Sequence, residues 1–182
     1  WPIPVFSTQP HELERAVAAA DKVKIERVFA DIKDRFAASS YAPQAALLVA
    51  KQSYEVGNAA GAKAALRWAA AQSSDPAYQA IAKLRLAGVL MDDKALDEAL
   101  TLLGGSFPAE FEALVSDRQG DIFSAQAKHE QAIAAYQKAY TGLTERSEYR
   151  RLVAVKLNAL GVDPEPAAKA DAATAAASEV KK

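Results

Sequence analysis

The sequence predicts an all-α fold made of paired helices, and three observations support this prediction. First, apolar residues recur at helical spacing, as at Ala132, Tyr136 and Ala139. Second, pairs of small residues stand 12 positions apart in three separate stretches, as from position 50 to 62. Third, these stretches follow one another at offsets of 37 and 33 residues, from position 50 to 87 and from 87 to 120. The small pairs are Ala50 with Ala62, Ala87 with Ala99, and Gly120 with Ala132.

The small residues have a physical role in such a repeat. Two antiparallel helices approach closely where both carry small side chains, so each small pair is expected at the contact. Larger residues one turn later, Leu66, Leu103 and Tyr136, then fill the space towards the next pair. A period of about 34 residues built of paired helices indicates a tetratricopeptide-like helix-pair solenoid, with about three repeats plus capping helices. The alternative is a plain Ala-rich helical bundle in which the spacing is accidental.

Turn and end signals complete the solenoid. Each predicted pair reverses direction at a short polar or Gly-containing dipeptide, namely Gly57-Asn58, Asp92-Asp93 and Ala127-Lys128. Residues 11–20 and 24–36 predict a further helix pair without the small-residue pattern, as is typical of a terminal cap. Residues 148–160 predict a closing helix that Gly161 and Pro164 stop.

The two ends of the chain differ from this helical domain, which we expect over residues 11–162. Residues 1–10 hold three Pro and predict an extended, Pro-rich N-terminal segment. Residues 163–182 are low in bulky apolar residues and predict a mobile Ala/Pro-rich tail. Because the chain begins at Trp1, we expect a processed or truncated product.

Composition excludes several classes of function. The 22 basic and 23 acidic residues nearly balance, at a net charge of −1, so no general positive field favours nucleic acid or an anionic membrane. No apolar run approaches the roughly 18–20 residues that span a bilayer. Without Cys there are no disulfides, thiolate metal sites or Cys nucleophiles.

No catalytic constellation is apparent, so the sequence predicts neither an enzyme nor a metal or cofactor site. His11 and His129 are the histidines of the chain, and their polar surroundings favour simple solvation. Asp92-Asp93 and Asp97-Glu98 are better explained as a solvated turn and an acidic first helical turn, which complements the helix dipole. None of the short catalytic or phosphate-binding motifs is present.

What remains is a binding surface for another protein. In a helix-pair solenoid the first helix of each pair lines the concave face, and this mixed apolar and polar face suits an extended or helical segment. Alternatively, Leu47 and Leu84 simply pack against neighbouring helices. Lys51 and Arg118 are the only favourable residues for gripping a C-terminal carboxylate, which argues against such a clamp. The predicted partner-binding residues are Gln44, Leu47, Lys51, Tyr54, Leu84, Met91, Asp117, Asp121 and Ser124.

Over residues 41–160 the chain resembles the YfgM-like ancillary SecYEG translocon subunits. The resemblance is carried by "LRLAGVL" (84–90), by "GGSFPAEFEALVSDRQGD" (104–121) with its final "RQGD", and by Trp68 in "LRWAAA". It implies a tetratricopeptide-like periplasmic domain, held at the bacterial inner membrane by a single-pass anchor that is absent from this chain. It also implies partners, namely the SecYEG channel, a PpiD-like periplasmic chaperone or emerging chains, and no catalytic residues.

A second hypothesis is a self-assembling tetratricopeptide scaffold that is not tied to secretion. The apolar, Pro-rich residues 1–10 are not explained by the repeat, and they could pack in the groove of a neighbouring chain. This hypothesis predicts a homo-oligomer.

Overall fold

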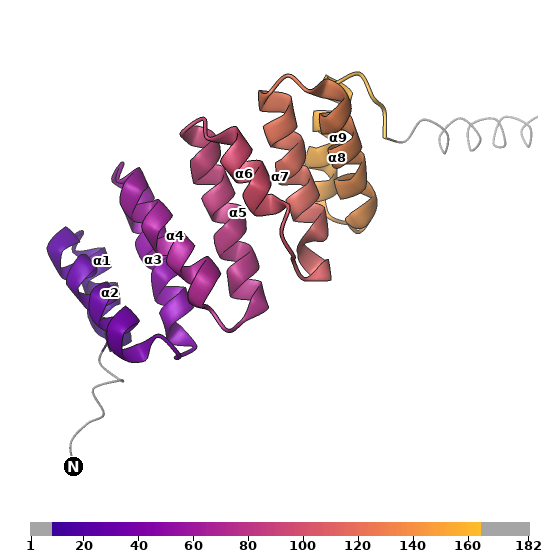
Figure 1. Ribbon diagram of the computed structural model, residues 1–182. Helices are drawn as coiled ribbons and strands as arrows, with labels where there is room; N and C mark the ends of the chain where they lie inside the picture. The colour runs from indigo at the N-terminus through magenta and orange to yellow at the C-terminus, as the bar shows by residue number, and fades with distance from the viewer. Residues whose placement is uncertain (1–8, 165–182) are drawn as a thin grey trace, which may run out of the picture. The chain divides into compact units, whose positions relative to one another are not determined.

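The computed structural model describes residues 9–164, and these residues are helical throughout apart from their connections. This confirms the predicted all-α fold. The predicted conformations of residues 1–8 and 165–182 lie outside the described residues, whereas Gln9 and Pro10 already belong to the first helix. The helices, shown in Figure 1, are α1 (Gln9–Ala18), α2 (Lys22–Phe36), α3 (Tyr41–Glu55), α4 (Ala59–Gln72), α5 (Pro76–Asp92), α6 (Leu96–Leu103), α7 (Glu112–Ala125), α8 (His129–Gly142) and α9 (Glu148–Ala159), with a 3₁₀ turn at Ala109–Phe111.

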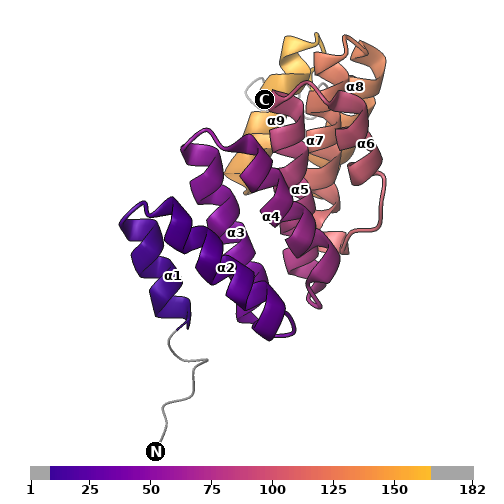
Figure 2. The same ribbon diagram turned by 60° about the vertical axis from the view of Figure 1, so that its left-hand side comes forward.

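The described residues form two compact units, and each is described by itself. Unit 1 ends at Ala109 and contains α1 to α6; unit 2 begins at Glu110 and contains α7 to α9. In unit 1 the pairs α1/α2, α3/α4 and α5/α6 follow one another, and α2 packs on α3 as α4 packs on α5 (Figure 2). In unit 2, α8 packs against both α7 and α9.

The reversal between the two helices of a pair uses the same backbone turn throughout. Ala20, Gly57, Lys94 and Ala127 all have positive φ, between 51° and 77°. After each of them the next N–H donates to a carbonyl five residues back, as from Asn58 N to Ser53 O at 2.7 Å. This hydrogen bond satisfies a carbonyl at the end of the first helix. The predicted reversals at Gly57-Asn58 and Ala127-Lys128 are confirmed, and the third falls at Lys94, one residue after Asp92-Asp93.

The small-residue pattern marks the helix contacts, as predicted. All three small pairs are buried, and so are Leu66, Leu103 and Tyr136. The closest approach is at Gly120, where a Cβ atom would lie 2.5 Å from the ring of Tyr136. In α1/α2 the equivalent positions, 37 residues before Ala50 and Ala62, hold the larger Leu13 and Ile25, and both are buried.

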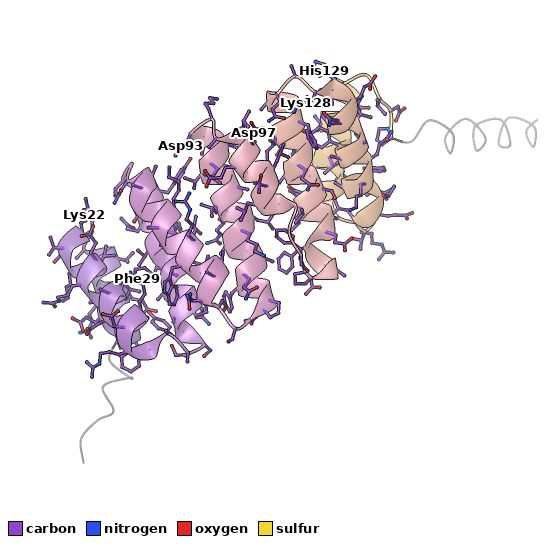
Figure 3. The ribbon with its side chains drawn as sticks, in the orientation of Figure 1. Lys22, Phe29, Asp93, Asp97, Lys128 and His129 are labelled. Carbon is purple, nitrogen blue, oxygen red and sulfur yellow. The ribbon has the colours of Figure 1, made fainter. Side chains whose placement is uncertain are left out.

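Side chains also join consecutive pairs in unit 1. The ring of Phe29, labelled in Figure 3, meets Trp68 edge-on at a centroid separation of 5.9 Å, which joins α2 to α4. Lys63 pairs with Asp93, and Arg67 Nη2 lies 2.7 Å from Glu98 Oε1. These last two ion pairs connect α4 to the turn and helix that follow α5, so the second and third pairs are held together by polar as well as apolar contacts.

Candidate functional site

A groove between α3 and α5 is the strongest candidate site of unit 1. It has a volume of about 460 Å³ and is open to solvent along one side. Of the predicted partner-binding residues, Lys51 and Tyr54 line it. The remaining lining comes mainly from α5, and the full set is Ala50, Lys51, Tyr54, Leu66, Arg85, Gly88, Val89 and Asp92.

The floor of the groove is apolar because it is made by the contact between the helix pairs. Ala50, Leu66 and Val89 are 3%, 2% and 7% exposed. Gly88 lies beside them, and a Cβ atom there would meet nothing within 4 Å. The backbone of α5 is therefore uncovered at this point of the groove.

The rim of the groove is polar, and some of its side chains pair with other side chains of the protein. The Tyr54 hydroxyl donates to Asp92 Oδ2 at 2.6 Å, which bridges α3 and α5, and this hydrogen bond raises the pKa of Tyr54. Lys51 Nζ lies 3.7 Å from Glu55 Oε1. Arg85 is exposed, and its side chain has no ion-pair or hydrogen-bond partner among residues 9–164.

The other predicted residues of unit 1 do not line this groove. Gln44 is exposed on α3, whereas Leu47 is only 8% exposed, as expected if it packs against neighbouring helices. Leu84 and Met91 are half-buried on α5. The stripe that lines the groove is Arg85, Gly88, Val89 and Asp92.

Sequence reasoning missed this α5 stripe by one residue. In an α-helix one residue corresponds to a rotation of about 100°, so a face centred on Leu84 and Met91 is not the face of Arg85 and Asp92. The spacing of the stripe, at positions 85, 88, 89 and 92, is itself a helical signal that could have found it.

In unit 2 the predicted acidic residues of α7 are engaged inside the protein. Asp117 is 1% exposed and accepts hydrogen bonds from Tyr149 Oη at 2.6 Å and from Lys156 Nζ at 2.8 Å. Lys156 Nζ also donates to Asp121 Oδ1 at 2.7 Å, and Tyr136 Oη donates to the same atom at 2.9 Å.

This network corrects the predicted placement of Asp117 on an open face. Tyr149 and Lys156 belong to α9, which brings their side chains to α7 and covers the Asp117 carboxylate. Burial first, and then the hydrogen bonds to Asp121 and Asp117, raise the pKa values of Tyr136 and Tyr149. Asp121 and Ser124 are half-buried.

Each of the two histidines lies on the surface of its own unit. His129 begins α8 next to Lys128, as Figure 3 shows, and both are exposed. His11 Nδ1 lies 3.8 Å from Glu14 Oε2. Within residues 9–164, no group of three or more His, Cys, Asp or Glu residues is placed to hold a metal ion. In the same part of the chain, no helix combines the length and apolar character that crossing a membrane requires.

The paired helices, their shared turn and the buried small residues define the chain as a helical-repeat protein. A sequence model of the tetratricopeptide repeat-like domain family matches residues 7–162, and the chain belongs to this family. The chain is also similar to the ancillary SecYEG translocon subunit of Neisseria gonorrhoeae, with 29% identity over 148 residues. The match covers 81% of this chain and 71% of that protein. Together these findings confirm the resemblance predicted from the sequence.

Proposed function

We propose that this chain is a non-enzymatic scaffold for protein–protein interaction, the periplasmic domain of an inner-membrane accessory subunit of the SecYEG translocon. In this role it links the channel to a periplasmic chaperone or receives emerging chains. The groove between α3 and α5 carries the interaction function, because it is an open, apolar-floored surface on a helical-repeat protein. The name of the similar N. gonorrhoeae protein, an ancillary SecYEG translocon subunit, supports the choice of the translocon as a partner.

The mechanism follows from rigidity. The groove walls are held by the Tyr54–Asp92 hydrogen bond, and the packing of α3, α4 and α5 fixes its floor. A preformed groove loses little conformational entropy when a partner binds, so more of the contact free energy remains as affinity. Neither metal nor cofactor enters this mechanism.

Site-specific photocrosslinking in cells tests the proposal. A photoreactive amino acid replaces Tyr54, which lines the groove, in the full-length membrane-anchored protein. We expect adducts with the channel or its chaperone. Met91 serves as a near neighbour outside the groove lining, and Ala64, which is exposed on α4 and also outside the lining, serves as a control.

The outcomes separate the two hypotheses. Translocon or chaperone adducts from Tyr54, stronger than those from Ala64, support the proposal. Adducts with a second copy of the same chain alone support the self-assembling scaffold instead. The absence of any adduct from Tyr54 contradicts both.

A further inference from the structure

Gly88 is a glycine that packing among residues 9–164 does not require. It lies inside the 17-residue helix α5, where glycine costs about 1 kcal/mol of helix stability relative to alanine. At Gly120 such a cost has a reason, because a Cβ atom would lie 2.5 Å from the Tyr136 ring. At Gly88 a Cβ atom would meet nothing within 4 Å. The missing side chain instead leaves the backbone of α5 open to the groove.

The surroundings of Gly88 fit an aliphatic side chain. Ala50, Leu66 and Val89 line the same groove and present apolar atoms around the exposed backbone. A Leu, Ile or Val side chain inserted there would contact α5 closely, since no Cβ atom keeps it away, and would leave water for an apolar surface.

Arg85 adds a charge requirement to this apolar site. It precedes Gly88 by three residues, so both lie on one face of α5, and both line the groove. The other charged groups of the lining are engaged: Lys51 lies near Glu55, and Asp92 accepts from Tyr54. The Arg85 side chain has no ion-pair or hydrogen-bond partner within residues 9–164, so its guanidinium is available to pair with an acidic group of a ligand.

We infer that the groove binds a protein segment with an aliphatic residue next to an acidic one. The aliphatic side chain lies over Gly88, and the neighbouring Asp or Glu pairs with the Arg85 guanidinium. A bidentate, charge-assisted hydrogen bond of this kind fixes the orientation of the bound segment and increases its affinity. The inference rests on the proposed interaction function and adds the chemistry of the segment that this groove selects.

A library of random twelve-residue peptides displayed on phage provides the test. The complete 182-residue chain is used for selection in three forms: unchanged, Arg85→Glu and Gly88→Leu. We expect the unchanged protein to enrich peptides with an aliphatic residue beside Asp or Glu. Arg85→Glu should enrich Lys or Arg at the acidic position, because the charge preference of the groove is reversed.

Gly88→Leu separates loss of binding from loss of folding. Leucine is a better helix former than glycine and would extend into open space, so the unfolding midpoint should equal or exceed that of the unchanged protein. The selected peptides should nevertheless bind this variant at least about tenfold more weakly, which corresponds to the loss of one well-made apolar contact. Arg15→Glu, an exposed reversal on α1, is the matched control and should leave binding unchanged.

Each result has a defined reading. Peptides whose binding is unaffected by both groove variants would overturn the inference, while the interaction function would stand on another surface. If no peptide is enriched by any form of the protein, the inference is also overturned, and the photocrosslinking result decides the interaction function separately. A consensus that follows the charge at position 85 supports the inference.

Discussion

At the residue scale, two glycines have opposite roles, although each lies inside the first helix of a helix pair. Gly120 permits the contact between α7 and α8, because the Tyr136 ring occupies the space of a Cβ atom. Gly88 faces open space in the groove. The same substitution at the two positions should therefore change stability in opposite directions.

We predict that Gly120→Ala lowers the free energy of unfolding by about 1–3 kcal/mol, since the ring of Tyr136 or the helices must move. Gly88→Ala should raise it by roughly 0.5–1 kcal/mol through helix propensity. Urea unfolding followed by circular dichroism measures both variants. Equal effects of the two substitutions would contradict the assigned close approach.

At the element scale, the repeated turn contains backbone strain that a substitution by glycine can relieve. Lys94 and Ala127 adopt positive φ values of 62° and 58°, which disfavour residues that carry a Cβ atom. In the equivalent turn Gly57 adopts 77° without this cost.

We predict that Ala127→Gly and Lys94→Gly each raise stability by about 0.5–1 kcal/mol, the relief of backbone strain being partly offset by a more flexible unfolded chain. Gly57→Ala should lower stability by about 1 kcal/mol. Thermal unfolding of the three variants at neutral pH is the measurement. A loss of stability in the two glycine variants would show that these turns carry no strain.

The docking of α9 is a second feature of this scale. Its residues Tyr149 and Lys156 reach the buried Asp117 and the half-buried Asp121 on α7. Removing one side chain of this network leaves buried polar groups without hydrogen-bond partners. The resulting loss of stability is larger than the net contribution of the hydrogen bond itself.

The raised pKa of Tyr149 makes this docking sensitive to alkaline pH. Below the ordinary tyrosine pKa of about 10 both folded and unfolded chains keep the proton, so the contribution to stability is fully present. As the pH rises further, the unfolded chain loses the proton first, and stability is lost through the folded pKa. Tyr149→Phe should lower stability at neutral pH by about 1 kcal/mol and make the alkaline decline shallower. Urea midpoints between about pH 8 and pH 11 test this, and an unchanged slope would contradict it.

At the scale of the whole molecule, the chain contains two compact units, residues up to 109 and residues from 110. In helical-repeat proteins stability is approximately a sum of local terms, so a defect in one region is felt mainly there. Gly120 belongs to unit 2, whereas the groove belongs to unit 1.

We predict that Gly120→Ala reduces hydrogen-exchange protection in α7 to α9 more than in α3 to α6, and leaves the selected peptides able to bind. Exchange measured by mass spectrometry resolves the helices separately. An equal loss of protection across both units would show that the chain unfolds as one cooperative structure.

The fold could be predicted to this extent because its signals are local. The spacing of Ala50 and Ala62, and its recurrence at Ala87 and Gly120, encodes both the helices and their closest contacts. Helical periodicity and turn residues depend on neighbours within a few positions, so a single sequence contains them. The first pair was also recognised as a helix pair, although Leu13 and Ile25 replace the small residues.

The site was predictable only in part, because exposure depends on residues that are distant in the chain. Lys51 and Tyr54 were identified from their face of α3, but Arg85 and Gly88 became visible only once the packing of α5 against α3 and α4 was known. Asp117 is covered by Lys156, 39 positions later, and no local pattern indicates that contact. The sequence by itself therefore determined the helices, their pairing and the family, whereas the tertiary structure decided which helix faces stay open, since a face is open only where no other element covers it.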